Sequence, residues 1–199
     1  MPRVVDQDEK RATIARAAYE VIAAEGIGGA TMRAIARQAS CTTGMVVHYF
    51  DDKQDVLLHA HNHAAQDVRR RMREHEHNLR GLALLLALLE EILPADQRRR
   101  GNWRIWMAFW DESVAAPGVH NEQSNRVTEW HRRLKRALLQ AIEDGEVDSS
   151  INLSDEVDLI ASLLEGLAIQ VIVHGRTIGA ARQLRLVKEY LRRLSSKSA

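Results

Sequence analysis

Aromatic and acidic residues are concentrated in one segment near the middle of the chain. Trp103, Trp106 and Trp110 are spaced i, i+3 and i+7, which places them on one face of a predicted helix. Aromatic rings attract a cationic ligand through cation–π contacts, and a nearby carboxylate from Asp111, Glu112 or Glu165 would supply the balancing charge. The residues predicted to line a small-molecule pocket are Trp103, Trp106, Phe109, Trp110, Asp111, Trp130 and Glu165.

Two other interpretations of this segment stay open. Aromatic stripes at helical spacing are common in ordinary cores, so each tryptophan is also a candidate for core packing. Asp111 and Glu112 are a candidate acid–base pair for an all-helical enzyme, which would need a carboxylate of perturbed pKa that no pattern here requires. A purely architectural helical protein is a third alternative.

The remaining reactive residue types give weaker signals. His59 and His63 have the i, i+4 spacing of a zinc-chelating pair, but no third ligand is apparent and a solvated linker helix is the favoured interpretation. We therefore predict neither a metal site nor a cofactor. Cys41 is the single cysteine, which excludes an internal disulfide, and a small packed residue is favoured over a redox sensor.

Composition restricts the possible partners. Of 199 residues, 45% are hydrophobic and 28% are charged, with a net charge of +1. That balance excludes a strongly basic, non-specific coat for nucleic acid but allows one local DNA-binding surface. The polar N-terminus is unlike a secretory signal, and the longest apolar run, from Leu82 to Leu89, is too short to span a bilayer. We expect a cytoplasmic protein with no membrane partner.

The hydrophobic periodicity is helical throughout, which predicts an all-α fold of about nine helices. A three-helix unit occupies residues 1–53, the fourth helix (53–78) is a polar connector, and a larger helical bundle fills 79–199. Helices are expected around 14–22 and over 32–38, 42–49, 53–78, 82–93, 97–114, 121–143, 154–174 and 182–194.

The first unit has the pattern of a helix-turn-helix. Two short helices joined by a tight turn follow a longer one, and the third helix is narrow enough to enter a major groove. Thr31 and Thr42 are positioned to cap the two short helices, and Gly44 leaves the front of the third helix bare. Tyr49 is also a candidate core residue and Lys53 a solvated helix start. The predicted DNA contacts are Thr31, Arg33, Thr42, Thr43, Gly44, Met45, His48, Tyr49 and Lys53.

The run from Thr31 to Phe50, followed by Lys53, resembles the N-terminal domain of the tetracycline-repressor (TetR) family. The stretch 42–50 and the tryptophan-rich segment resemble its BetI-like subgroup. The resemblance implies a homodimeric repressor of palindromic operator DNA, released by a small-molecule inducer such as choline or another quaternary amine. Ser40 stands where the family usually has glycine, and a left-handed backbone there would cost about 1 kcal/mol.

The helix at 154–174 is apolar around most of its circumference, so most of it must be buried. Together with the last helix it is expected to form a four-helix dimer interface, although a buried helix inside a monomer is the alternative. Inducer binding is expected to act on the DNA-binding unit through the helix at 53–78. The predicted interface residues are Leu163, Gly166, Leu167, Gln170, Leu184, Val187 and Leu191.

Overall fold

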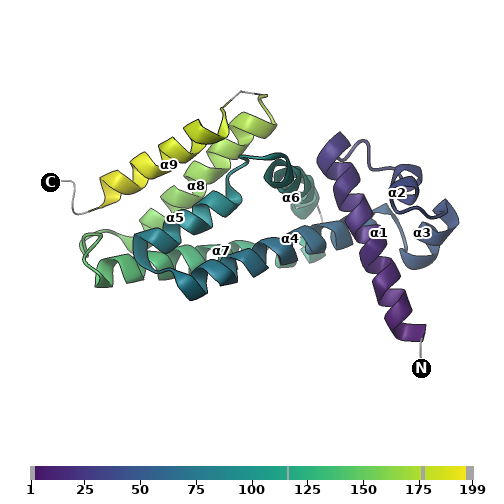
Figure 1. Cartoon of the computed structure of the whole chain (residues 1–199), viewed down its shortest axis with the longest axis horizontal. Helices are drawn as coiled ribbons and strands as arrows, with labels where there is room; N and C mark the ends of the chain where they lie inside the picture. The colour runs from purple at the N-terminus through teal and green to yellow at the C-terminus, as the bar shows by residue number, and fades with distance from the viewer. Residues whose placement is uncertain (1–2, 116, 176–177, 196–199) are drawn as a thin grey trace. The chain divides into compact units, whose positions relative to one another are not determined.

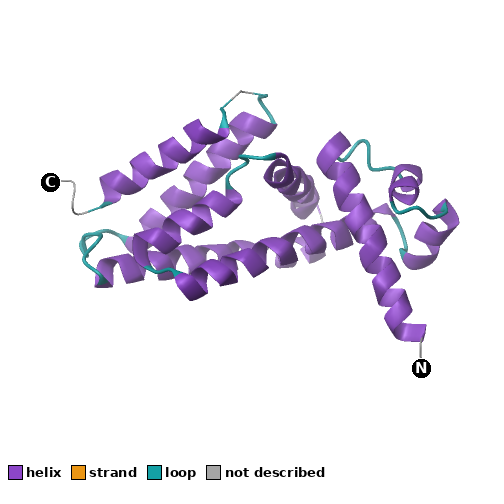
Figure 2. Cartoon of the chain, viewed as in Figure 1, coloured by secondary structure: helices purple, strands orange, loops and turns teal. Residues whose placement is uncertain are grey.

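The computed structural model describes residues 3–115, 117–175 and 178–195, without the side chains of 3–6 and 108–124. Within these ranges the regular structure is helical (Figures 1 and 2), apart from an isolated bridge between Val147 and Ser195. None of the described helices combines the length and the apolar character of a membrane span. The all-α prediction is confirmed by the helices α1 (Arg3–Glu25), α2 (Met32–Gln38), α3 (Thr43–Tyr49), α4 (Lys53–Asn78), α5 (Gly81–Ile92), α6 (Gln97–Ala115), α7 (Pro117–Glu143), α8 (Leu153–Ile172) and α9 (Ala180–Leu194).

The chain divides into two compact units, and both α4 and α6 contribute to each. The N-terminal unit runs to Val68 and includes Arg100–Asp111, and the second unit comprises Arg69–Arg99 and the residues from Glu112 onward. This division differs from the predicted boundaries at residues 53 and 79. Contrary to the polar connector expected from the sequence, α4 buries an apolar stripe that includes Val56, Leu57 and Ala60.

The core of the N-terminal unit is built where α1, α2 and α3 meet. Ile22 of α1, Ile35 of α2 and Val46 of α3 are each almost completely buried. Phe50, which follows α3 directly, is buried with them. The two short helices differ in how they are held, because α2 buries Ala34, Ile35 and Ala36 whereas α3 buries Val46 alone and keeps most of its seven residues at the surface.

The turn between α2 and α3 has the left-handed geometry that glycine normally supplies. Ser40 has a φ of 52°, the only positive φ among the described non-glycine residues. The backbone N–H of Cys41 donates to the carbonyl of Ala36 at 2.9 Å and closes the turn. The departure from glycine therefore leaves the geometry of the turn intact, at a conformational cost of about 1 kcal/mol.

The second unit is a helical bundle with a leucine-rich core. α5 packs along α7 and against α9, while α8 packs on α7. The start of α5 is fixed by Glu146, whose carboxylate accepts a hydrogen bond from the N–H of Leu82 at 2.8 Å. A carboxylate at this position satisfies a free N–H group and complements the positive end of the helix dipole. The core includes Leu84, Leu85, Leu88, Leu89, Leu134, Leu138, Ile160 and Leu164.

Candidate functional site

Both predicted caps are present at the short helices. The hydroxyl of Thr31 accepts a hydrogen bond from the N–H of Ala34, and that of Thr42 accepts one from the N–H of Met45, both at 3.1 Å. A capping hydroxyl still has its own hydrogen to donate to a second acceptor. Both threonines are exposed, so each retains a donor that suits a phosphate oxygen.

The helix α3 combines one buried residue with an exposed front. Val46 has 0% of its surface accessible, whereas the adjacent Val47 is 59% exposed and Met45 39%. Thr43 and His48 are exposed as well, and a Cβ at Gly44 would have only the Thr42 hydroxyl within 4 Å. We call the exposed residues Thr43, Gly44, Met45, Val47 and His48 the α3 face.

Val47 was absent from the predicted DNA contacts, although it is among the most exposed large hydrophobic side chains described. Val47 follows Thr43 by four residues and Gly44 by three, and this helical spacing places it on the same side of α3 as those two residues. Tyr49 is half-buried, with its ring 5.2 Å from that of His48. Arg33 and Lys53 are exposed at the helices on either side of α3.

A polar network missed by sequence reasoning joins α1, α4 and the residue that ends α3. Arg11 of α1 forms an ion pair with Asp55 of α4 at 3.3 Å and lies over the ring of Phe50, 5.1 Å from its centroid. The Nδ1 atom of His59 lies 3.1 Å from the same carboxylate, and its ring contacts Phe50 edge-on. The network therefore ties the C-terminal end of α3 to two longer helices.

His59 and His63, the two histidines of α4 with the spacing of a zinc-chelating pair, are engaged in packing. His63 contacts the ring of Tyr19 at 5.8 Å, and His59 contacts Asp55 and Phe50 as described above. Across the described part of the chain, no group of three or more histidine, cysteine or acidic residues has the arrangement of a metal site.

A cavity of about 350 Å³ opens between α1 and the turn before α3. Burial raises the pKa of the Cys41 thiol in its wall, and Lys10 opposes that shift. A raised thiol pKa reduces the thiolate fraction, which favours a packed cysteine over a redox sensor. The lining residues are Lys10, Thr13, Ile14, Ala39, Ser40, Cys41, Thr42 and Met45.

The first two tryptophans of the aromatic segment pack within the N-terminal unit. Trp103 is buried, Trp106 is half-buried, and their ring centroids are 5.3 Å apart in an edge-to-face arrangement. The backbone of α6 lies close to α1, because a Cβ at Gly101 would be 2.6 Å from that of Ala23. Arg104 adds a hydrogen bond to the carbonyl of Ala23. The side chains of Phe109, Trp110, Asp111 and Glu112 lie outside the described residues.

Trp130 and Glu165, the other predicted ligand contacts, belong to the second unit. Trp130 is half-buried on α7, and Glu165 lies on the exposed side of α8. Partial desolvation raises the pKa of Glu165, and nearby His131 opposes the shift. The composite pocket remains a prediction, because its residues are divided between the two units.

The predicted dimer residues divide between the core of the protomer and the outer side of α8. Leu167, Val187 and Leu191 are buried in the core of their own protomer, and Leu184 is half-buried. Leu163, Gly166 and Gln170 instead lie on the outer side of α8, in line with two residues absent from the prediction: Leu159, 56% exposed, and Val173, 62% exposed. We call this row, Leu159, Leu163, Gly166, Gln170 and Val173, the α8 stripe.

Comparisons with known proteins match both parts of the chain. Residues 14–60 match the family described as bacterial regulatory proteins, tetR family, and residues 81–196 match the C-terminal domain described as BetI-type transcriptional repressor. The HTH-type transcriptional regulator BetI of Paraburkholderia phytofirmans is 26% identical over 203 residues, covering 96% of each chain. The protein of the same name from Escherichia coli O17:K52:H18 is 28% identical over 189 residues, covering 89% of this chain and 90% of that one.

Solved structures share the fold. A regulator from Saccharomonospora viridis, solved in complex with choline, superposes with a TM-score of 0.86 at 20% identity, covering 94% of this chain and 98% of that one. A transcriptional regulator from Rhodococcus sp. Rha1 gives a TM-score of 0.78 at 20% identity, covering 92% and 95%. Both have the overall helical fold described above.

Proposed function

Since the chain belongs to the TetR family of bacterial regulatory proteins and carries the C-terminal domain of BetI-type transcriptional repressors, we propose that it is a homodimeric repressor that binds palindromic operator DNA in the cytoplasm and is released by a small-molecule inducer. The family agrees with the resemblance seen in residues 31–53. The enzyme alternative depends on Asp111 and Glu112, whose side chains lie outside the described residues, and we do not propose it.

The observation that carries the DNA-binding proposal is the exposed α3 face above a single buried anchor, Val46. A helix held in this way can enter a major groove without disturbing its own core. Its front offers a hydroxyl, a bare glycine and two apolar side chains to base edges and thymine methyl groups. Exposed Arg33, Arg37 and Lys53 supply positive charge for the flanking phosphates.

The proposed dimer is supported by the α8 stripe and by the two-fold symmetry that a palindromic operator would require. The α8 stripe is apolar except for Gln170, and a mostly apolar row on the outer side of a helix suits a partner surface. A Cβ added at Gly166 would have nothing within 4 Å, so a neighbouring helix can approach closely there. A two-fold dimer presents two α3 helices to two half-sites, about one helical turn apart or a multiple of it.

Operator binding is expected to depend steeply on salt. With DNA from upstream of the protein's own gene, a gel-shift series from 50 to 200 mM salt should show affinity falling by about 10³-fold if about six phosphates are neutralised. Scrambled DNA of equal length is the control. An affinity that stays flat across this range would contradict binding through phosphate contacts.

For the inducer we propose a quaternary amine, with choline as the first candidate. The support is the choline complex of the Saccharomonospora viridis regulator and the edge-to-face pair Trp103 and Trp106 in this chain. Choline should change tryptophan emission saturably and weaken the gel shift. The neutral isostere 3,3-dimethylbutan-1-ol should do neither, because cation–π attraction needs the charge. No response at millimolar choline, or an equal response to the isostere, would argue against this ligand class.

A further inference from the structure

The cavity between α1 and the turn before α3 lies entirely within the N-terminal unit, where α1 packs against both α2 and α3. Three consecutive small residues of the turn, Ala39, Ser40 and Cys41, line it. Small side chains leave space that larger ones would fill, so α1 and the turn can be neighbours and still enclose a cavity. Its volume of about 350 Å³ is within the range of small-molecule sites, about 300–1,000 Å³.

One face of α1 forms the opposite wall of the cavity. Lys10, Thr13 and Ile14 are spaced i, i+3 and i+4, so their side chains share that face. Ile14 is only 2% exposed and supplies an apolar surface, while the hydroxyl of Thr13 already donates to the carbonyl of Glu9 at 2.9 Å. Of the eight residues that line the cavity, Lys10 carries a positive charge and none is acidic. The cavity is therefore suited to a ligand with one negative charge.

The polar groups around the cavity support this charge assignment. Burial raises the pKa of the Cys41 thiol, and the opposing effect of Lys10 indicates that the positive charge acts at the cavity wall. The hydroxyl of Thr42 accepts a hydrogen bond from the N–H of Met45 and keeps its own hydrogen to donate. An ammonium group and a hydroxyl donor together suit a carboxylate. The flexible side chain of Met45 and the side chain of Ile14 supply apolar surface for the rest of the ligand.

We propose that this cavity binds a small carboxylic acid with a compact apolar body. The site shares no residue with the predicted inducer pocket, so it would be a second ligand site, located in the DNA-binding unit itself. A bare inorganic anion would leave the apolar wall uncovered, and a neutral molecule would gain nothing from Lys10.

The expected consequence of binding rests on the proposed function, because Thr42 and Met45 are also predicted DNA contacts. A bound carboxylate places a negative charge beside Thr42, where a phosphate oxygen is expected, and it offsets the charge of Lys10. Like charges repel, so the acid and the operator should each weaken the binding of the other. The site would thus lower operator affinity without any involvement of the inducer pocket.

The single cysteine makes occupancy of the cavity measurable in the full-length protein. Cys41 lines the cavity, so a bound acid should slow its alkylation by iodoacetamide, followed by mass spectrometry of the Cys41 peptide. The probes are benzoate, phenylacetate and cyclohexanecarboxylate, each with sodium chloride added to a constant ionic strength. At least one acid at about 10 mM should slow alkylation saturably by about threefold or more. Benzyl alcohol should protect less than benzoate, and inorganic phosphate should not protect.

Three variants test the roles of the charge and of the space. Lys10→Met keeps most of the length of the side chain and removes its charge, so the Kd of the protecting acid should rise about threefold. Lys135→Met removes the same charge from an exposed position on α7 in the second unit and should leave that Kd unchanged. Ala39→Leu should fill the cavity and remove the acid's effect on alkylation, with circular dichroism to verify that the variant is folded.

The outcomes separate the site from its effect on DNA. An absence of saturable protection by all three acids would overturn the site, as would equal protection by benzoate and benzyl alcohol or an unchanged Kd in Lys10→Met. In gel shifts at constant ionic strength, the protecting acid should raise the operator Kd of the wild type about threefold and that of Ala39→Leu less. Protection of Cys41 with an unchanged gel shift would overturn only the effect on DNA. Protection in a wild type that binds no operator would contradict the proposed function and leave the site in place.

Discussion

Replacing Arg133 with alanine is expected to lower the free energy of unfolding by about 3 kcal/mol, because two carboxylates would lose their buried partner. Arg133 is 8% exposed and donates to Glu76 of α4 at 2.5 Å and to Glu129 of α7 at 2.6 Å. Glu129 retains about a third of its side-chain exposure, which places the cost at the lower end of the range for a broken buried pair. Urea unfolding of the full-length protein measures the loss.

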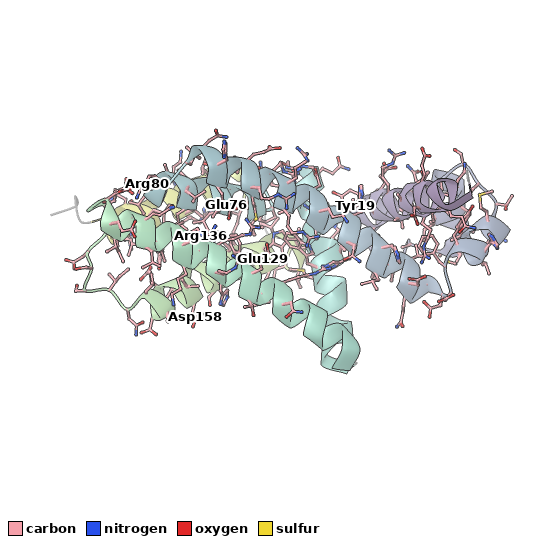
Figure 3. The ribbon with its side chains drawn as sticks, turned by 90° about the horizontal axis from the view of Figure 1, so that it is seen from below. Tyr19, Glu76, Arg80, Glu129, Arg136 and Asp158 are labelled. Atoms are coloured by element: carbon pink, nitrogen blue, oxygen red, sulfur yellow. The ribbon has the colours of Figure 1, made fainter. Side chains whose placement is uncertain are left out.

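The matched control is Arg136→Ala, on the same helix and at the surface (Figure 3). It removes the same charge and should change stability by no more than about 0.5 kcal/mol. Arg133→Met should recover part of the loss by filling the volume with apolar atoms. Equal stability of Arg133→Ala and Arg136→Ala would show that the buried ion group contributes nothing.

The same group makes stability depend on acid. The hydrogen bond from Arg133 is the largest cause that holds the pKa of Glu129 below its usual value. A folded-state pKa below the unfolded value means that the stabilisation is fully present at neutral pH. The stabilisation is lost as the pH falls from about 4.3, the ordinary pKa of a glutamate, through the lowered pKa of Glu129 in the folded protein. In Arg133→Ala this part of the acid sensitivity should disappear.

The second large effect is expected on DNA binding. Val47→Asp places a carboxylate on the α3 face, where it would approach phosphates and lose apolar contact with base edges. We expect operator affinity to fall at least about 100-fold, equivalent to about 2.7 kcal/mol, with little change in unfolding because Val47 is 59% exposed. Fluorescence anisotropy with labelled operator DNA measures the first quantity and thermal melting the second.

Val46→Ala provides the contrast at the adjacent residue. Val46 is fully buried, so its truncation should cost about 2 kcal/mol of stability in the N-terminal unit. Any loss of operator affinity in Val46→Ala should result from this instability, and it should therefore become smaller at low temperature. If Val47→Asp bound operator as tightly as the wild type, the α3 face would not be in the groove.

The helix-turn-helix was predictable because its signals are local. A threonine before each short helix supplies a cap within three residues of its target, and small residues in the turn limit the possible geometries. The exposure of Thr43, Gly44 and His48 follows from the helical spacing around a single buried valine. The exposure of Val47 was not predicted, because its side chain is apolar and an apolar residue is ordinarily assigned to a core.

The features that could not be predicted from the sequence depend on packing between residues that are far apart along the chain. Arg11 and Asp55 are 44 residues apart, and no local pattern marks them as an ion pair. Residues 100–111 join the N-terminal unit, where glycine at position 101 allows the backbone of α6 to approach Ala23. Leu167, Val187 and Leu191 have the spacing of an interface, but they fill the core of their own protomer, since periodicity identifies an apolar face and not what covers it.

A hydroxyl-radical and methylation-interference footprint on the DNA upstream of the protein's own gene tests most directly whether paired α3 helices bind operator DNA. Two related patches of major-groove interference are expected, with centres about 10 base pairs apart or a multiple of that spacing. Val47→Asp should abolish both patches together. A single unpaired patch, or protection confined to the phosphates with no interference at bases, would contradict a dimer that recognises sequence with α3.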